Sequence, residues 1–176
     1  MVHKQQSLIS ASFTGNDPIK VAQGYNGDKI SLVGIRKLLI MHQKDFDSWN
    51  KKKIKLDAKP NDGVFFYEKE VWWVSIGHNI RFEQDGKGSE FARPVLVLRK
   101  FNKFLFLGVP LSSTKKLGKY YFSFVYKGRQ ESAALLSQLR AYDSNRLIDK
   151  DGVIDDRNYQ MIQKKIAKII NQKPVK

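Results

Sequence analysis

The sequence contains no cysteine, which excludes disulfide bonds, thiolate metal sites and cysteine nucleophiles. Its three histidines, His3, His42 and His78, are scattered along the chain and show no metal-ligand spacing. We therefore expect neither a metal site nor any other cofactor.

Acidic residues are scarce relative to basic ones. Asp and Glu number 17 against 32 Lys and Arg, so the formal charge is +15 and the pI is near 9.9. This surplus favours an anionic partner, with nucleic acid first, an acidic protein second and a membrane surface last. High charge is also a common solubility device, so by itself it supports nucleic-acid binding only modestly.

Long hydrophobic runs are also missing. The first ten residues, MVHKQQSLIS, lack the apolar core of a signal peptide. The most apolar run, Ile30–Met41, carries Arg36 and Lys37 and is far shorter than the roughly 20 residues that a membrane span needs. We expect a cytoplasmic protein that does not enter membranes, with a folded core built from its 41% hydrophobic residues.

The N-terminal part is the least informative. It contains turn signals at 16–18 (NDP) and 24–28 (GYNGD), and Ile30–Met41 fits either a strand or a short helix. We assign residues 1–42 to an extension of unknown role. An upstream extension, a misassigned start codon with Met41 as the true start, and a small added domain all fit.

A helix is predicted over about Lys44–Asp57. At three- and four-residue spacing, one face collects Phe46, Trp49, Lys53 and Leu56, whereas the other lysines point elsewhere. This basic helix would either hold RNA backbone or pack on the rest of the domain with a solvated outer face, and the second interpretation is favoured. A turn at 60–63 ends it, and Val64–Tyr67 is expected to pack on the outside of the domain.

Strand-like runs dominate the remainder of the 43–176 domain. They are rich in β-branched and aromatic residues and lie at Val71–Ile76, Pro94–Phe101, Phe104–Val109, Lys119–Lys127 and Ser132–Leu139. The run through Tyr120–Tyr126 is apolar on both faces, which predicts burial on both sides or a subunit interface. Turns are expected at Gly128 and at 151–152.

Helical signals close the chain. Asp143 is predicted to cap a short helical turn through Ile148, and Asp155 a final helix to about Ile170. On that helix Ile162, Ile166, Ile169 and Ile170 form one stripe. Short strands without βαβ alternation predict a mainly β (α+β) fold, a small antiparallel barrel with a helix before it and a C-terminal helix.

Several ordered blocks carry a family resemblance. Between Val71 and Lys168 the sequence contains, in order, WWVSIG, EQDGKG, RPVLVL, GVPLSS and LLSQLRAYDSNRLI, which resemble the PemK/MazF-like toxins of bacterial toxin–antitoxin pairs. The resemblance implies an SH3-like barrel, a homodimer and inhibition by a cognate acidic antitoxin. It also implies a sequence-selective endoribonuclease that cleaves single-stranded mRNA to a cyclic phosphate and a 5′-OH end.

Cleavage of RNA without a metal can use the ribose 2′-OH as nucleophile, and the protein must then stabilise the dianionic phosphorane. Arg93 can present a fork of donors to two phosphate oxygens, although a salt bridge with Glu83 or Glu90 is its alternative role. The resemblance places Ser112 at a hydroxyl position that could hold a phosphate oxygen; a strand-end turn bond is the alternative. Glu83 matches an acidic position and could accept a proton.

Further contacts to RNA are assigned to side chains on the loops and in the last block, namely Gln84, Lys87, Ser113, Lys115, Gln138 and Arg140. A structural amide and a strand-exit ion pair are equally acceptable roles for Gln138 and Arg140. Of Trp72 and Trp73, one should be in the core, and the outward one could stack a base or face a partner subunit.

One feature departs from the compact members of the family: the segment EQDGKGSEFAR, which runs from Glu83 to Arg93, is longer. Two other functions are compatible with the same barrel. One is a non-catalytic toxin of the gyrase-poisoning CcdB-like type, which would need exposed partner-binding residues rather than the Arg93–Ser112 pair. The other is a basic RNA-binding barrel that leaves RNA intact.

Overall fold

The computed structural model describes residues 22–23, 29–30, 44–60, 64–126 and 131–172, and the chain divides into two compact units, Met1–Lys44 and Asp45–Lys176. In the first unit the strands β1 (Ala22–Gln23) and β2 (Lys29–Ile30) pair antiparallel. Several predicted features lie outside the described residues, namely the turns at 16–18, 24–28 and Gly128, most of the turn at 60–63, and the segment 31–41. So do His3 and His42, and the assignment of residues 1–42 to an extension stays a prediction.

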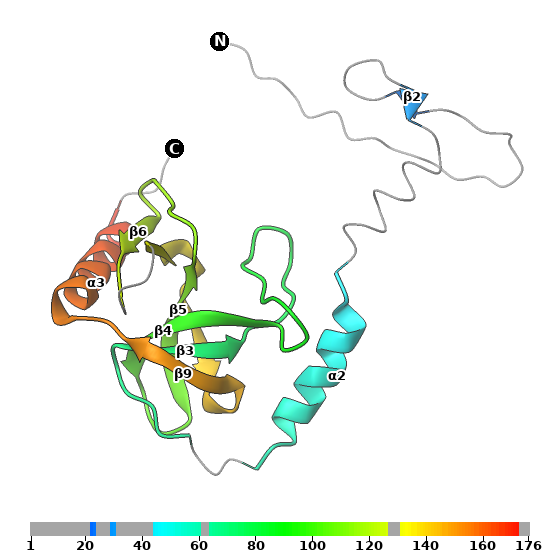
Figure 1. Cartoon of the computed structure of the whole chain (residues 1–176), viewed down its shortest axis with the longest axis horizontal. Helices are drawn as coiled ribbons and strands as arrows, with labels where there is room; N and C mark the ends of the chain where they lie inside the picture. Colours follow the sequence, from blue (N-terminus) through cyan, green and yellow to red (C-terminus); the bar gives the residue numbers. More distant parts are fainter. Residues whose placement is uncertain (1–21, 24–28, 31–43, 61–63, 127–130, 173–176) are drawn as a thin grey trace, which may run out of the picture. The chain divides into compact units, whose positions relative to one another are not determined.

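The second unit is a mainly β structure with one helix before the sheet and one after it, as predicted (Figure 1). Its elements are α2 (Phe46–Asp57), β3 (Glu70–Ser75), β4 (Ala92–Lys100), β5 (Leu105–Ser112), β6 (Tyr121–Phe124), β7 (Ser132–Leu135), the 3-10 turn η1 (Leu136–Gln138), β8 (Arg140–Asp143), the 3-10 turn η2 (Ser144–Arg146), β9 (Leu147–Val153) and α3 (Asp156–Ile170). Neither α2 nor α3, the helices that the structure describes, combines the length and apolar character that crossing a bilayer requires.

The sheet is antiparallel throughout, with strand order β6-β7-β5-β4-β3-β9 and with β8 pairing the other end of β5. Two registers matter for the site: Val74 pairs with Arg93 between β3 and β4, and Val95 pairs with Pro110 between β4 and β5. Among the described strands β8 and β9 do not pair with each other, so the small barrel is open between them.

One hydrophobic cluster lies inside the curved sheet. Strands β3, β4, β5, β8 and β9 all contribute to it, with Val74, Val95, Phe106, Tyr142 and Leu147 among the buried side chains. Phe66 also lies in this cluster and is fully buried, so the expectation that 64–67 packs on the outside is wrong for that residue, although Phe65 and Tyr67 are exposed. Alternation explains the difference, since neighbours in an extended segment point to opposite sides.

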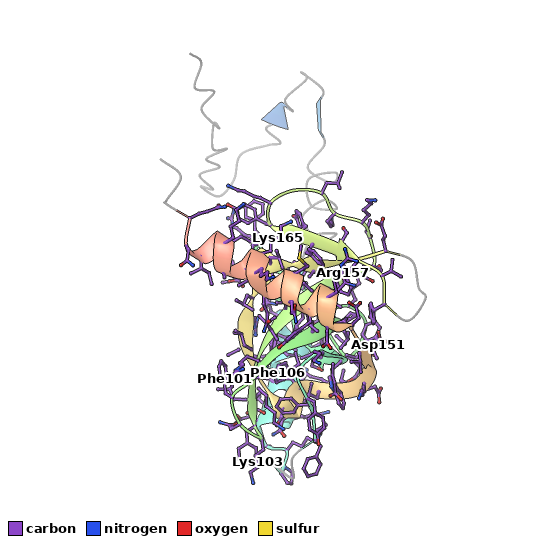
Figure 2. The ribbon with its side chains drawn as sticks, turned by 90° about the vertical axis from the view of Figure 1, so that its left-hand side faces the viewer. Phe101, Lys103, Phe106, Asp151, Arg157 and Lys165 are labelled. Atoms are coloured by element: carbon purple, nitrogen blue, oxygen red, sulfur yellow. The ribbon has the colours of Figure 1, made fainter. Side chains whose placement is uncertain are left out.

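A second cluster lies between the other face of the sheet and α3, which crosses it in Figure 2. Asp155 caps the helix as predicted, accepting a 2.8 Å hydrogen bond from the Asn158 amide. The predicted stripe is confirmed at Ile162 and Ile166, which are buried, whereas Ile170 is 70% exposed at the last turn.

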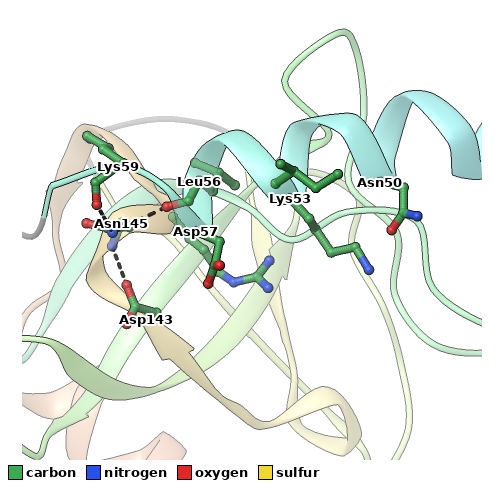
Figure 3. A pocket seen from close by; sticks show the side chains of 9 residues that line it. Asn50, Lys53, Leu56, Asp57, Lys59, Asp143 and Asn145 are labelled. Atoms are coloured by element: carbon green, nitrogen blue, oxygen red, sulfur yellow. Dashed lines mark hydrogen bonds between the residues drawn. The ribbon is translucent and has the colours of Figure 1, made fainter.

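Helix α2 is anchored chiefly through one side chain. Asp45 caps it, and Trp49, 5% exposed, packs against Phe91 with a ring-centroid distance of 5.5 Å. The predicted four-residue face is wrong in the main, because Phe46 is about half exposed and Lys53 is exposed. At the other end Asn145 donates to the carbonyls of Leu56 and Lys59 at 3.3 and 3.1 Å, which fixes the C-terminus of the helix (Figure 3).

Three further predictions need correction. The strand expected over Ser132–Leu139 ends at Leu135, and β8 starts at Arg140, because the η1 turn separates two strands that pair with different parts of β5. The expected turn at 151–152 is part of β9, where a register shift against β3 accommodates Asp151. The run 120–126 is not buried on both sides, because Phe124 and Tyr126 are in the core but Val125 is half exposed; its alternative role as a subunit interface stays a prediction.

Glu70 at the start of β3 is a buried carboxylate whose ionised form is stabilised. It is 6% exposed, accepts from the Tyr67 amide (2.9 Å) and Trp72 Nε1 (2.8 Å), and pairs with Lys150. Burial by itself would raise the pKa of Glu70, but these donors outweigh it and hold the pKa below its usual value. The stabilisation is therefore present above the unfolded-state pKa and is lost as the pH falls through the folded-state pKa.

Glu70→Gln is accordingly expected to lower the free energy of unfolding at neutral pH by roughly 1–3 kcal/mol, because hydrogen bonds to a charged group are weakened. Urea unfolding between pH 7 and pH 3 should show a smaller loss of stability with acid for the variant than for the unmodified protein. Glu131→Gln, which alters an exposed pair with Lys115, is the control. Parallel pH profiles for Glu70→Gln and the unmodified protein would contradict the assignment.

Candidate functional site

Arg93 stands near the start of β4, where a loop formed by residues 77–91 covers the strand end. Its Nε donates to the carbonyl of Asp85 at 2.8 Å and its Nη1 to the carbonyl of Leu111 at 3.2 Å. With the Gln84 amide oriented so that both of its polar atoms are satisfied, Gln84 Oε1 accepts from Arg93 Nη2 at 2.8 Å. A guanidinium has five N–H donors, so Nη1 and Nη2 each keep one for which no partner is found among the described residues.

The partners of Arg93 are carbonyl groups rather than the carboxylates considered from the sequence. Glu90 pairs with Lys52, and Glu83 accepts from the amide of Ile80 at 2.9 Å, closing its own turn. Burial lowers the pKa of Arg93, and the negative charge of Asp85 acts in the opposite direction. The result is a fixed, half-buried cation whose positive charge is not neutralised by direct contact with a carboxylate of the described residues.

The 77–91 loop is ordered by its own polar side chains. Asn79 was not identified from the sequence. Its backbone amide donates to Asp85 Oδ1 at 2.6 Å, and its side-chain Nδ2 donates to the Gln84 carbonyl at 2.8 Å. The Gly86 amide donates to the Gly77 carbonyl at 2.8 Å across the base of the loop. These bonds hold Asp85, and through it Arg93, in one position. No local pattern marks Asn79 and Asp85, because their roles depend on how the loop closes.

Gln138, at the end of η1, and Arg140, at the start of β8, hold the same loop by hydrogen bonds. Gln138 Oε1 accepts from the Gln84 amide at 2.9 Å, and its Nε2 donates to the Phe82 carbonyl at 3.3 Å. Arg140 Nη1 donates to Asn79 Oδ1 at 3.3 Å. The structure therefore links Arg93, Gln84 and Gln138 in one hydrogen-bonded chain, with Arg140 beside it.

Ser112 ends β5 close to Arg93. Arg93 Nη1 donates to the carbonyl of Leu111, the residue that precedes Ser112. Ser112 Oγ accepts from the Thr114 amide at 3.3 Å, which is the turn bond foreseen as its alternative role. A hydroxyl that accepts one bond can still donate its own hydrogen.

The other predicted contacts are more peripheral. Lys115 pairs with Glu131 at 2.9 Å, Ser113 and Lys87 are exposed, and the Lys87 backbone pairs with Ala92 at the loop. Within the described residues neither these three side chains nor Glu83 makes a hydrogen bond to Arg93. Their assignment to RNA contacts stays a prediction.

A hollow of about 380 Å³ adjoins Ser112 on the other face of the sheet. It is lined by Trp73, Pro94, Leu111, Ser113 and Tyr126, among others. Trp73 is 39% exposed, whereas Trp72 is buried and donates to Glu70, which confirms that the two tryptophans alternate. An exposed indole beside a hydroxyl offers a stacking surface next to the polar site.

Three arginines surround one end of the inner core. Burial raises the pKa of Tyr142 to about 12, and the charges of Arg140, Arg146 and Arg93 oppose that rise. Arg146 donates to the Ser75 carbonyl at 2.9 Å, and burial followed by repulsion from Arg140 lowers its pKa. Sequence reasoning missed Arg146, although it lies in the same resemblance block as Gln138 and Arg140. This concentration of positive charge would attract a phosphodiester.

The Tyr142 hydroxyl itself is buried, with no hydrogen-bond partner among the described residues. An unsatisfied buried hydroxyl costs about 1–3 kcal/mol, so Tyr142→Phe is expected to raise the free energy of unfolding by roughly 1 kcal/mol. Chemical denaturation of the variant measures this change directly, and Tyr126→Phe, which removes a hydroxyl bonded to Asp151, should move stability the other way. A loss of stability in Tyr142→Phe would show that its hydroxyl has a partner.

Comparison with protein-family models identifies the family of this chain. Residues 68–170 match the model of the PemK-like, MazF-like toxins of type II toxin–antitoxin systems, which is more than half of the chain. The chain belongs to this family. In this PemK/MazF-like toxin the match begins just before β3 and ends with α3, so it contains the barrel and the Arg93 site, while α2 precedes it.

Solved structures of similar fold carry related descriptions. MazF from Deinococcus radiodurans is 15% identical to this chain, with a TM-score of 0.49. The match covers 62% of this chain and 99% of the MazF chain. An endoribonuclease in complex with its cognate antitoxin from Mycobacterial species is 12% identical with a TM-score of 0.48, covering 62% and 100%. The Mycobacterium tuberculosis toxin MazF-mt6 is 13% identical with a TM-score of 0.45, covering 59% and 98%. A search of curated proteins gave no match.

Proposed function

We propose that this toxin is a sequence-selective endoribonuclease that cleaves single-stranded mRNA in the cytoplasm without a metal ion. The 2′-OH of the nucleotide 5′ to the cleaved bond attacks the phosphorus, the 5′-oxygen of the next nucleotide leaves with a proton, and a 2′,3′-cyclic phosphate remains. The protein's task is to bind the phosphate and to stabilise the charge that grows on its oxygens.

The fixed Arg93 guanidinium carries this proposal. Three protein acceptors, the carbonyls of Asp85 and Leu111 and the Gln84 side chain, orient the group, and one donor remains on each terminal nitrogen. Two such donors lie in the plane of the guanidinium and match two non-bridging phosphate oxygens. Because the group is already oriented, little reorganisation is needed as the phosphorane forms.

Ser112 and Glu83 complete the proposed set. Ser112 follows Leu111, whose carbonyl accepts from Arg93, and can donate its hydroxyl hydrogen to a phosphate oxygen. Glu83 is the proposed proton acceptor because it is an exposed carboxylate one residue from Gln84, on the loop that holds Arg93. Trp73 offers an indole face on which a base of the substrate can stack.

The partners are proposed from charge and kinship. The Mycobacterial relative is described as being in complex with its cognate antitoxin, and the +15 charge of this chain suits an acidic inhibitor of that kind. We further propose a homodimer in which a second copy supplies the other wall of the RNA groove, with residues 43–176 as the toxin domain and 1–42 as an appended segment.

The proposal is tested by incubating the purified full chain with a broad set of mRNAs in excess EDTA and mapping the ends. Cleavage should persist and should leave cyclic phosphate and 5′-OH termini. A matched RNA with a single 2′-deoxy nucleotide 5′ to the cleaved bond should bind and remain intact, because it lacks the nucleophile. Cleavage of the deoxy substrate, or a strict need for Mg²⁺, would overturn the mechanism, and binding without any cleavage would favour an RNA-binding barrel.

A further inference from the structure

A second basic surface lies on the side of the 77–91 loop away from Arg93. Gln84 and Asp85 contact Arg93, whereas Gly86 to Phe91 form one wall of a groove of about 770 Å³ whose other wall is α2. Figure 1 shows α2 alongside this part of the molecule. We call this hollow the α2 groove. One loop therefore separates the candidate site from a second concave surface.

The α2 groove is lined by more positive than negative charge. Its lysines are Lys51, Lys52, Lys55 and Lys87, and its carboxylates are Asp45 and Glu90. Both carboxylates are engaged, because Glu90 pairs with Lys52 and Asp45 accepts from the Ser48 amide at 2.9 Å. In the described part of the chain no carboxylate lies within ion-pair distance of the other three lysines, all of which are exposed.

The walls of the α2 groove are held firmly together. Trp49 fills the space over Gly77, where an added Cβ would lie 2.1 Å from the indole ring, and Arg146 stacks on the same indole at 5.5 Å. Asn145 fixes the far end of the helix, beside a second hollow lined by Lys53 and Asp57 (Figure 3). Because the walls do not have to be ordered on binding, a ligand would meet a preformed surface.

We propose that the α2 groove binds the sugar–phosphate backbone of the RNA substrate beyond the cleaved step. This inference rests on the proposed function, because it takes RNA as the ligand of the neighbouring site. Lys51 and Lys55 lie one helical turn apart, about 6 Å along the axis, which is comparable to the spacing of successive phosphates in a single strand. Lysine ammonium groups on flexible stems suit such sequence-independent contacts.

Charge and composition favour RNA over a protein partner. The core of a protein–protein interface is depleted of lysine and enriched in aromatic anchors, whereas backbone-binding surfaces are rich in lysine. In the α2 groove the ring-bearing side chains are those of His78 and Phe91, and Phe91 is 8% exposed. The groove also lies outside the family match on its α2 side, since that match starts at residue 68. The helix wall of the groove is therefore not part of the family match, whereas its loop wall is.

The test compares two double variants with the same charge change and the same helical spacing. Lys51→Gln/Lys55→Gln alters the groove, and Lys164→Gln/Lys168→Gln alters exposed positions on α3. The probes are the single 2′-deoxy RNA of the cleavage assay in a minimal length and in a form extended on both sides. If the unmodified protein cleaves nothing, oligouridylates of the same two lengths replace them.

The groove variant should bind the extended RNA roughly five- to tenfold more weakly at low salt. The slope of log Kd against log salt should decrease by about 1.4, because each of the two lost phosphate contacts contributes about 0.7 to it. Its binding of the minimal RNA and its single-turnover cleavage of a minimal all-ribose substrate should match the α3 variant. The inference would be overturned if both variants bound extended RNA with the same affinity, or if the groove variant lost the same affinity for both RNA lengths. It would also be overturned if the groove variant bound the antitoxin more weakly while its RNA binding was unchanged. A length effect without cleavage would support the groove and refute the proposed function alone.

Discussion

Arg93→Ala is expected to slow single-turnover RNA cleavage by roughly 10²–10³-fold, the usual consequence of losing one donor that acts in the transition state. Binding of the 2′-deoxy RNA should weaken only mildly, because the other lysines and arginines still contact the backbone. The reason is that the two terminal donors of Arg93 matter most when charge accumulates on the phosphorane oxygens.

The same substitution also removes hydrogen bonds to Asp85, Leu111 and Gln84, so it should lower the free energy of unfolding by about 1–3 kcal/mol. Rates must therefore be compared well below the melting temperature of the variant. Arg99→Ala is the matched control, because Arg99 lies on β4 but is exposed, with Glu68 3.5 Å away. Its cleavage rate should stay close to that of the unmodified protein.

Arg93→Lys separates charge from geometry. It keeps the positive charge but loses the planar fork, so it should recover only part of the lost rate. A lysine that restores full activity would show that a point charge is enough. Equal losses of binding and cleavage in Arg93→Ala would assign the residue to docking rather than to the chemical step.

The sequence predicted the fold well where local patterns decide structure. The strand that starts at Glu70 and the cap at Asp155 follow from β-branched runs and from a side chain suited to capping, which act within a few residues. It failed where strand pairing decides. Strand β8 forms because its residues pair with one end of β5, and the bulge at Asp151 forms where β9 pairs with β3. Local periodicity does not predict such pairing between distant segments.

The candidate site shows the same division. Arg93, Gln84 and Gln138 were found through the family resemblance, and the structure joins them. Asn79 and Arg146 were missed, because their roles arise from loop closure and from contact with α2. The helix itself was predicted, but its buried face was not, since one tryptophan rather than a continuous stripe anchors it.

Gly86→Ala is expected to be a strongly damaging small substitution in the loop. A Cβ at Gly86 would lie 1.7 Å from the carbonyl oxygen of Phe91, a backbone atom that no side-chain rotation can move. That oxygen accepts from the amides of Ile76 and Gly77 at 3.0 Å each, so displacing it opens the base of the loop. Overpacking of this kind typically costs about 1–3 kcal/mol of stability.

A loss of activity is expected in addition to the loss of stability. Gly86 follows Asp85, whose carbonyl orients Arg93, and a misplacement of about 1 Å at a catalytic group can cost roughly 10²-fold in rate. Gly88→Ala is the matched control: Gly88 has a φ of +66° but nothing within 4 Å of an added Cβ. It should cost only about 1–2 kcal/mol of backbone strain and leave cleavage nearly intact.

Thermal unfolding and single-turnover cleavage of both glycine variants, compared at a temperature where each is folded, separate these effects. The ratio of the two cleavage rates should be near 10², because only Gly86→Ala moves the backbone that orients Arg93. If Gly86→Ala cleaves as fast as Gly88→Ala, the position of the 77–91 loop does not control Arg93. The catalytic fork would then have to be oriented by β4 and Leu111 alone.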